Sequence, residues 1–423
     1  METEIYQAYV SVLKKELVPA LGCTEPIAVA FAAAKAGELL GEFPLQMRVS
    51  CSGNIVKNVK SVTVPNSGGP KGIDAAAILG LVGGNADLAL EVLSQVKEDD
   101  IRKTKELLKS DFCSVFLQEN VDNLYINVQL RSENHRAEVT VSHRHTNISH
   151  AALDGEEIID SCEETAAAES RDFLSVRGIL EFADSVLSED VQDVLDAQIR
   201  CNTAISDYGL ETPVGAQVGR TLLKDGASDY RTLSKARAAA GSDARMSGCS
   251  LPVMINSGSG NQGLTVSLPV ITYAEKFNCS RAALYRALVI SNLISIHIKR
   301  HIGSLSSFCG AVSASCGVGA AMTYLAGGTF AQICTTISNT LLTAGGMVCD
   351  GAKPSCAAKI AAAVDSAVTA HEMSMSGCAF LDGEGLMQHD IEETIAAIGY
   401  VAAVGMKDTD VQILKIMTGE IKV

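Results

Sequence analysis

The chain contains no tryptophan, and only 4% of its 423 residues are aromatic. A core with so few large rings must pack its helices closely through small side chains, and alanine and glycine are abundant. Basic residues are also scarce, because 34 lysines and arginines stand against 49 acidic residues and leave a net charge of −15. Affinity for nucleic acid comes mainly from lysine and arginine on phosphates, so this balance argues against a nucleic-acid partner.

Signals for export and for membrane insertion are missing too. The start of the chain, Met-Glu-Thr-Glu-Ile, has neither a basic segment nor an apolar core, so no signal peptide is expected. The apolar stretch 311–343 is interrupted by Gly317, Gly327 and Gly328, which favours buried core helices over a membrane span. The 13 cysteines are an odd number in a chain too large to need disulfides. A reduced, cytoplasmic protein with no membrane partner is therefore expected.

Three of the cysteines, Cys309, Cys349 and Cys356, lie in turn-prone segments rich in small residues. A cysteine beside glycine or proline can turn its sulfur away from a helix end toward a shared centre. Three thiolates that converge on one point suit an iron–sulfur cluster with one open iron, and an open iron is a Lewis acid. This pattern makes an enzyme the leading hypothesis.

The spacing of these cysteines leaves another interpretation open. Their intervals of 40 and 7 residues lack the paired C-x₂₋₄-C pattern of structural zinc sites. The alternative is that all three only fill the core, as we expect of Cys201 and Cys334.

The apolar pattern predicts two kinds of structure along the chain. With 47% hydrophobic and 20% charged residues, the chain can bury a large core, and its length suggests two or three domains. Alternating apolar residues predict strands in 46–64, 124–130 and 137–141, whereas helical spacing dominates after residue 165. We therefore predict an α+β fold, with a mainly helical catalytic domain and a smaller strand-containing lobe in the N-terminal half. Its expected parts are N-terminal helices packed with the catalytic part (1–45), an α/β lobe (46–165) and a helical cluster-binding domain (166–423).

The segments around the three cysteines resemble a known family. Ser304–Gly328, with its Ser-Phe-Cys-Gly, resembles the first cluster-cysteine segment of bacterial iron–sulfur L-serine dehydratases of the α-chain type. Asn339–Asp350, which ends in Val-Cys-Asp, resembles the second segment. Pro354–Lys359 is similar to the third, although the gap before it is shorter here.

Over nearly its full length the chain is more similar to the L-cysteine desulfidase branch of that family. This branch carries a Gly-Cys-Thr-Glu-Pro motif, found here at Gly22–Pro26. The resemblance implies a [4Fe–4S] cluster held by Cys309, Cys349 and Cys356, with Cys23 at the active site. It also implies conversion of L-cysteine into pyruvate, ammonia and hydrogen sulfide.

Cys23 is the second candidate for chemistry. It precedes the helix that Pro26 opens, where unpaired backbone N–H groups and the helix dipole favour a thiolate. We therefore predict that Cys23 acts as a general base or proton relay; the alternative is a cysteine buried at a tight turn. Glu25 is expected to cap the helix or to hold the substrate ammonium.

Several loops offer groups for a free amino acid, which needs donors for its carboxylate and acceptors for its ammonium. Asn54, Asn66 and Lys71 lie in glycine-rich or strand-end loops, although each residue type is also common in plain turns. His145 can supply an acid or base near neutral pH, and its loop 142–147 loosely resembles the Ser-His-Thr loop of the serine dehydratases.

The glycine loop 256–263 contains two further candidates, Ser257 and Asn261. It can present backbone N–H groups to a carboxylate, and it resembles the family's glycine loop without that loop's proline and threonine. Its Gly-x-Gly-x-x-Gly does not follow a strand of a βαβ unit, so no dinucleotide site is expected. No lysine context indicates pyridoxal phosphate.

The sequence therefore predicts a [4Fe–4S]-dependent lyase that acts on a small amino acid, with L-cysteine desulfidase as the preferred activity. L-Serine dehydration with the same residues is the alternative, because an open iron would assist loss of hydroxide as readily. A non-catalytic iron–sulfur sensor is the second alternative, and it would leave Cys23 and the polar loops unexplained. The glycine- and alanine-rich helices also allow a homodimer.

Overall fold

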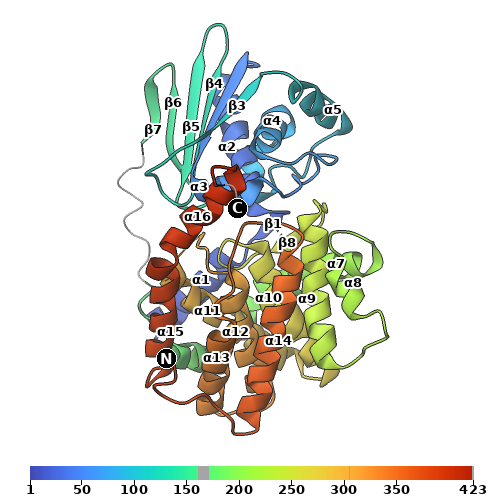
Figure 1. Cartoon of the computed structure of the whole chain (residues 1–423), viewed down its shortest axis with the longest axis vertical. Coiled ribbons are helices and arrows are strands. Elements are labelled where there is room, and N and C mark those ends of the chain that lie inside the picture. The colour runs from blue at the N-terminus through green and yellow to red at the C-terminus, as the bar shows by residue number, and fades with distance from the viewer. Residues whose placement is uncertain (161–170, 304, 422–423) are drawn as a thin grey trace.

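The computed structural model describes residues 1–160, 171–303 and 305–421. Figure 1 shows a lobe with a sheet above a larger part built almost entirely of helices. The predicted α+β class is confirmed. The boundary that the sequence predicts between residues 165 and 166 lies outside the described residues.

The lobe is formed by elements from the first 160 residues. Its helices are α2 (Thr24–Leu40), α3 (Gly53–Val59), α4 (Ile73–Gly83) and α5 (Glu98–Leu107), with a 3₁₀ helix, η1, at Ala86–Glu91. Its strands are β2 (Gln46–Cys51), β3 (Cys113–Leu117), β4 (Tyr125–Arg131), β5 (Arg136–Ser142), β6 (Ile148–Leu153) and β7 (Glu156–Asp160).

These strands form one sheet in the order β3-β2-β4-β5-β6-β7, with all neighbours antiparallel except β2 and β3. The register places the buried residues Val49, Val128 and Val139 side by side. Helices α2 and α4 pack against one face of the sheet (Figure 1). This one-sided burial explains the alternating apolar pattern of β4 and β5.

The larger part contains the remaining helices and one strand pair. Its helices are α1 (Thr3–Glu16), α6 (Val176–Ser185), α7 (Ser188–Glu211), α8 (Val218–Leu222), α9 (Tyr230–Met246), α10 (Gly260–Lys276), α11 (Arg281–Ile302), α12 (Gly310–Leu325), α13 (Phe330–Ala344), α14 (Cys356–Met375) and α15 (Ile391–Tyr400). A π-helical turn, η3 (Val401–Gly405), leads from α15 into α16 (Lys407–Thr418). Strand β1 (Pro19–Leu21) pairs antiparallel with β8 (Pro252–Met254).

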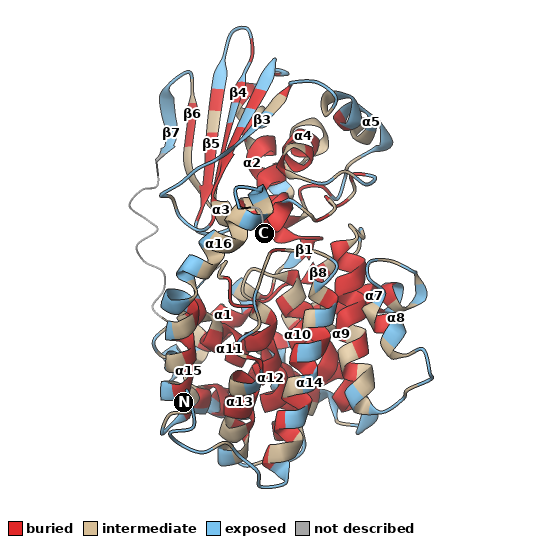
Figure 2. Ribbon diagram, in the orientation of Figure 1, coloured by how far each residue is buried: buried red, intermediate tan, exposed pale blue. Residues whose placement is uncertain are grey.

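The core of the helical part is packed through small residues. Figure 2 shows continuous burial along α10, α11 and α12. A Cβ atom on Gly317 of α12 would lie 2.1 Å from the carbonyl oxygen of Ser291 on α11, so only glycine allows this approach. This backbone contact is the close packing that the scarcity of aromatic residues predicts.

Two predictions from the sequence need correction. The expected strand 46–64 ends at Cys51, because Ser52 accepts a hydrogen bond from the backbone N–H of Ile55 and starts helix α3 instead. The N-terminal helices within residues 1–45 were expected to pack with the helical part, but of these helices only α1 does so, against α6, α7 and α11. Helix α2 packs instead on α4 and the sheet of the lobe, because nearly all its side chains are apolar and need cover on both sides.

Among the described residues, no helix combines the length and the apolar character that crossing a membrane requires.

Candidate active site

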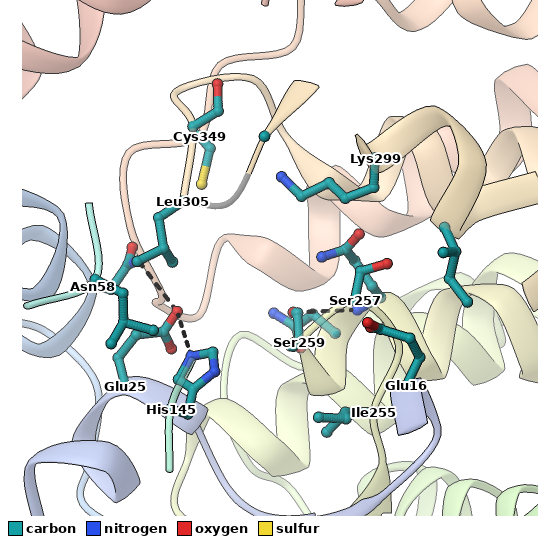
Figure 3. A pocket seen from close by; sticks show the side chains of 18 of the residues that line it. Glu16, Glu25, Asn58, His145, Ile255, Ser257, Ser259, Lys299, Leu305 and Cys349 are labelled. Atoms are coloured by element: carbon teal, nitrogen blue, oxygen red, sulfur yellow. Dashed lines mark hydrogen bonds and ion pairs between the residues drawn. The ribbon is translucent and has the colours of Figure 1, made fainter. Parts of the chain in front are cut away.

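A cavity of about 940 Å³ lies between the lobe and the helical part. Most of the residues that the sequence singles out line this cavity, and Figure 3 shows several of them facing it. They are Cys23, Glu25, His145, Ser257, Asn261, Cys309, Cys349 and Cys356. Segments nearly 300 residues apart in the chain therefore meet in one site.

Two of the three cysteines are held by a short backbone ribbon. Phe308 and Val348 form an antiparallel bridge. The Cys349 N–H donates to the Ser307 carbonyl at 2.6 Å, and the Cys309 N–H donates to the Met347 carbonyl at 3.0 Å. This pairing fixes Cys309 and Cys349 on adjacent segments.

The third cysteine comes from the next helix. Cys356 is the first residue of α14, and its Sγ lies 3.7 Å from the Gly351 carbonyl oxygen. Cys309 is the N-cap of α12. Helix starts therefore hold two of the three sulfurs, where partial positive charge favours a thiolate.

The three thiols influence one another and are accompanied by cations. Burial raises the pKa of Cys309 to about 12, and the neighbouring charge of Cys349 adds to this effect. Burial also raises the pKa of Cys356, with a further contribution from Cys349. The Lys359 ammonium opposes both shifts, and Lys299 is close enough that the thiolates act on its own pKa, which burial lowers to about 8. The site thus has cations that would balance a negatively charged group.

Three cysteine thiols are a donor set of the kind that an iron–sulfur cluster uses. All three cysteines are free of disulfides and line one cavity. In the parts of the chain that the structure describes, no three His, Cys, Asp or Glu side chains are arranged around one metal ion. A cluster places each thiolate on a different iron, so its ligands are spread more widely than those of zinc.

Cys23 and Glu25 form a buried pair in the same cavity as the three cysteines, and Cys356 packs against the apolar cluster that contains Cys23. The Cys23 Sγ donates to Glu25 Oε2 at 3.0 Å, and the Asn58 amide donates to Glu25 Oε1 at 3.3 Å. The His145 Nε2 lies 4.0 Å from Glu25 Oε1. Both Cys23 and Glu25 are buried, with exposed fractions of 1% and 8%.

In the Cys23–Glu25 pair, the negative charge lies on the Glu25 carboxylate. Burial alone would raise the pKa of Glu25, but His145, Cys23 and Arg245 outweigh it. Their combined effect lowers the Glu25 pKa to about 2. Burial raises the pKa of the Cys23 thiol well above its usual value, and the Glu25 carboxylate raises it further. Both effects favour a protonated Cys23, which donates its hydrogen bond to Glu25, over the thiolate that the helix start favours.

The loop that carries Ser257 is held in an uncommon backbone conformation by a buried amide network. Ser257 has a φ of 49°, and Gly258 has a φ of 75°. The Ser257 hydroxyl donates to Asn256 Oδ1 at 2.9 Å, while the Asn256 amide donates to Asn292 Oδ1 at 3.0 Å. Asn292 in turn accepts from the Gln198 amide at 3.0 Å. Because Asn256, Asn292 and Gln198 are fully buried, this network fixes the loop firmly.

Several polar atoms of cavity-lining residues lack a hydrogen-bond partner among the described residues. Asn261 Oδ1 and His145 Nε2 are both buried, and neither has a hydrogen-bond partner among the described residues. A buried polar atom without a partner costs about 1–3 kcal/mol. Such atoms at the wall of a cavity are positions where a polar ligand would supply the missing hydrogen bonds.

Three residues that the sequence nominated as substrate contacts do not line the cavity, and we leave them out of the site. Asn54 makes its hydrogen bond to Asn123, at 3.4 Å. Asn66, with a φ of 55°, donates to the Leu93 carbonyl at 2.8 Å and so serves a turn. Lys71 is exposed and pairs with Thr63 through the backbone.

Sequence reasoning also missed two cations that line the cavity, Arg245 and Lys299. Arg245 is only 2% exposed, and its Nε donates to the Gly22 carbonyl at 2.7 Å. Lys299 follows a long apolar run on α11. The apolar run before Lys299 is a signal that could have identified it, whereas Arg245 lies in a helix with several other charged residues and has no such signal.

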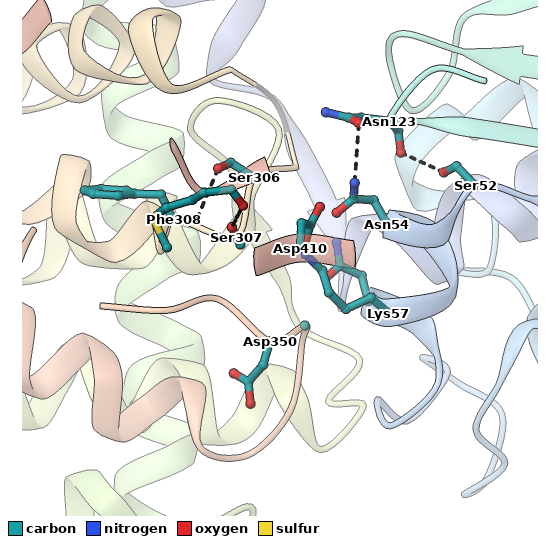
Figure 4. A network of polar contacts seen from close by, with 12 residues as sticks. Ser52, Asn54, Lys57, Asn123, Ser306, Ser307, Phe308, Asp350 and Asp410 are labelled. Atoms are coloured by element: carbon teal, nitrogen blue, oxygen red, sulfur yellow. Dashed lines mark hydrogen bonds and ion pairs between the residues drawn. The ribbon is translucent and has the colours of Figure 1, made fainter. Parts of the chain in front are cut away.

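Helix α16 joins the lobe to the helical part close to the cysteines. Figure 4 shows Lys57 of α3 paired with Asp410 of α16. The Lys57 side chain is 2% exposed, and its carbonyl oxygen would lie 2.3 Å from a Cβ atom on Gly351. Helix α3 is thus held between α16 and the loop that follows Cys349.

The chain was compared with known proteins. The family described as serine dehydratase alpha chain matches residues 87–415. A UPF0597 protein of Finegoldia magna is 48% identical over 412 residues, which cover 97% of this chain and 99% of that protein. A UPF0597 protein of Lachnoclostridium phytofermentans is 49% identical over 417 residues, which cover 98% of this chain and 100% of that protein.

The chain belongs to the serine dehydratase alpha chain family. A further relative, the UPF0597 protein of Desulfitobacterium hafniense, is 48% identical over 418 residues, with 98% of this chain and 97% of that protein covered. Membership in the serine dehydratase alpha chain family indicates a lyase of the serine-dehydratase type. The names of these relatives specify no substrate.

In this member of the serine dehydratase alpha chain family, Glu25 should contribute to stability in a pH-dependent way. Its folded pKa of about 2 lies below the usual value of 4.5, so its contribution is present above pH 4.5 and is lost as the pH falls through 2. Between pH 5 and pH 2 the free energy of unfolding should fall by about 3 kcal/mol more in the wild type than in Glu25→Gln. Urea unfolding at each pH measures this difference. The exposed Glu420→Gln control should follow the wild type, and parallel pH curves for Glu25→Gln and wild type would contradict the assignment.

The Lys57–Asp410 pair should stabilise the junction between the two parts. Asp410→Ala leaves a buried ammonium without its partner, which should lower the free energy of unfolding by about 1–3 kcal/mol. Asp408→Ala removes an exposed carboxylate from the same helical turn and should change it by less than about 0.5 kcal/mol. Chemical denaturation measures both, and equal effects of the two substitutions would show that the buried pair contributes nothing special.

Proposed function

We propose that the protein is an iron–sulfur-dependent lyase that converts L-cysteine and water into pyruvate, ammonia and hydrogen sulfide. The observation that carries this proposal is the meeting of three free cysteines with the Cys23–Glu25 pair in one cavity. Membership in the serine dehydratase alpha chain family supports the same class of reaction.

Cys309, Cys349 and Cys356 would hold a [4Fe–4S] cluster, with Lys299 and Lys359 as neighbouring cations. When bound, the cluster would supply an open iron, a Lewis acid for the group that leaves the β-carbon. The cations favour this arrangement because they offset the negative charge of the thiolates.

The protein's own groups are suited to binding a free amino acid. Arg245 and Lys299 provide positive charge for the substrate carboxylate. The Glu25 carboxylate and the unpartnered Asn261 Oδ1 provide acceptors for the ammonium. The rigid loop at Ser257 would fix the orientation between them.

The Cys23–Glu25 pair would move the α-proton. Glu25 is ionised and accepts the hydrogen bond of the Cys23 thiol, so it can take the thiol proton while Cys23 takes the proton from the α-carbon. The proton on Glu25 then leaves by way of His145, 4.0 Å from Glu25, and the pair returns to its starting state. Cys23 thus carries the role of base without being a resting thiolate.

L-Serine dehydration is the second candidate, and the family name favours it. The same residues would serve, because only the β-substituent differs between the two amino acids. A non-catalytic iron–sulfur sensor would have no use for a buried Cys23–Glu25 pair or for unpartnered polar atoms in the cavity. The expected homodimer and cytoplasmic location remain predictions.

One experiment separates these functions. The protein is purified and reconstituted with iron and sulfide without oxygen, and pyruvate formation is measured with L-cysteine and with L-serine. We expect turnover of L-cysteine to exceed that of L-serine. A higher kcat/KM for L-serine would favour the dehydratase, and a loaded protein inert to both would favour the sensor.

The three cavity cysteines should each be needed for the cluster. Cys309→Ser, Cys349→Ser and Cys356→Ser should each lose most of the iron and all activity, because each removes one ligand. Iron content and visible absorption of the reconstituted variants measure the loss. Cys201→Ser and Cys334→Ser serve as controls that keep both. Full iron content after one of the first substitutions would remove that residue from the ligand set.

Cys23 should be needed for turnover but not for the cluster. Cys23→Ala should keep the visible absorption and lose activity by about 10²–10⁴-fold, the usual contribution of an acid–base group. Cys51→Ala, at another fully buried cysteine of the lobe, is the matched control and should retain turnover. Melting temperatures of both variants test for damage to the fold. Normal turnover of Cys23→Ala would leave Cys23 with a structural role only.

A further inference from the structure

Two histidines at the edge of the cavity take no part in the chemistry described so far. His297 and His301 lie one turn apart on α11, with ring centroids 5.5 Å apart and ring planes at 84°. His297 is fully buried, whereas His301 is half-buried and lines the cavity. The pair therefore extends from the cavity wall into the helical core.

The inner histidine is connected to a carboxylate that reaches solvent. The Nε2 atom of His297 lies 2.6 Å from Oε2 of Glu392 on α15. The other oxygen of Glu392 accepts a hydrogen bond from the backbone N–H of Val176, at 2.7 Å. The Glu392 side chain is 40% exposed, so one end of this chain of groups contacts water.

One nitrogen of each ring has no hydrogen-bond partner among the described residues. His297 Nδ1 and His301 Nε2 are both buried, and neither has a hydrogen-bond partner within the described residues. Buried imidazole nitrogens without partners are costly unless they hydrogen-bond to one another directly or through a water molecule. A histidine with one nitrogen on a carboxylate and a second histidine ring one helical turn away has the connectivity of a proton wire.

We propose that Glu392, His297 and His301 form a proton relay between solvent and the active-site cavity. The proposal rests on the lyase function, since β-elimination produces a leaving group that must be protonated. At rest the ionised Glu392 accepts the Nε2 proton of His297. When solvent protonates Glu392, His297 takes the tautomer with its proton on Nδ1. Glu392 then gives its proton to Nε2 of His297 while the Nδ1 proton passes to Nε2 of His301. The other nitrogen of His301 releases a proton to the cavity, where it joins the sulfur that departs with the electron pair of the C–S bond. The α-proton taken by Cys23 and Glu25 returns to solvent, so one proton enters and one leaves in each turnover.

The charges around the histidines suit this role. Burial lowers the pKa of His301, and His297 and Arg300 lower it further, whereas Glu392 raises it. Burial raises the pKa of Glu392, but His297, the Val176 N–H and Arg300 together lower it below its usual value. His301 is therefore neutral near pH 7, and a neutral imidazole can both accept and donate a proton.

The first test needs no cluster and no turnover. Exchange of the His297 ring N–H with water is measured by ¹⁵N NMR on the metal-free protein, in the wild type and in Glu392→Gln. The relay predicts exchange at least 10-fold slower in Glu392→Gln, because the amide cannot pass a proton. A merely structural ion pair predicts equal or faster exchange, because its loss eases local opening, and that result would overturn the relay.

The second test is kinetic and uses the reconstituted enzyme. His297→Gln and His301→Gln should lower kcat about 10–100-fold with little change in KM, and imidazole in the buffer should restore part of the activity of His301→Ala. His371→Gln is the matched control, because His371 is also buried but bonds to Thr323 away from the cavity. Unchanged kcat in both relay variants would overturn the relay.

The two tests distinguish this proposal from the function on which it rests. If the wild type converts neither amino acid but exchange is slowed in Glu392→Gln, the lyase function is contradicted and a proton path from solvent to the cavity is still supported. If the wild type is active and kcat is unchanged in the relay variants, the relay is contradicted and the lyase function is still supported. Slowed exchange together with the loss of kcat supports both.

Discussion

The site depends on the backbone pairing of β1 with β8. These three-residue strands join the start of the chain to its middle, and the turns that follow them carry Cys23 on one side and Ser257 on the other. Gly22 can make its turn only as glycine, since its φ is 55° and a Cβ atom would lie 2.1 Å from Pro65. The Thr24 hydroxyl then bonds the Gly258 carbonyl at 2.9 Å, which locks the two turns together.

Burial of charge is the second constraint, and it is met by placing opposite charges on different elements. The Glu25 carboxylate belongs to the lobe, while Arg245 belongs to the helical part and also bonds the Gly22 carbonyl. Removing a charge from water is costly unless it is paired, so closing the lobe on the helices assembles the pairs as well as the cavity. The Lys57–Asp410 pair likewise joins opposite charges from two elements, α3 and α16. Stability of the junction and integrity of the site are therefore coupled.

The sequence predicted the parts of this protein that local pattern controls. Alternation in β4 and β5 follows from one-sided burial, and small residues in α12 follow from its contact with α11, so both could be read directly. The segment after Cys51 was predicted as a strand because of its valines, but it forms helix α3 because Ser52 caps the start of that helix. Asn54, Asn66 and Lys71 could not be placed, because a polar loop residue has the same appearance whether it faces a ligand or a turn. Arg245 and Lys299 were missed because what makes them notable is their burial.

The protonation state of Cys23 shows why the chemistry of such a site is hard to predict even when its residues are identified. The helix start that favours a thiolate is worth about 0.3–1 kcal/mol, which is less than one pKa unit. Burial can shift a pKa by about 3–5 units, and a carboxylate 3.0 Å from the sulfur acts in the same direction. The larger effects place the proton on Cys23 and the charge on Glu25, where His145 and Arg245 are near enough to stabilise it. Local sequence sets the small effect, and folding across the two parts of the molecule sets the large ones.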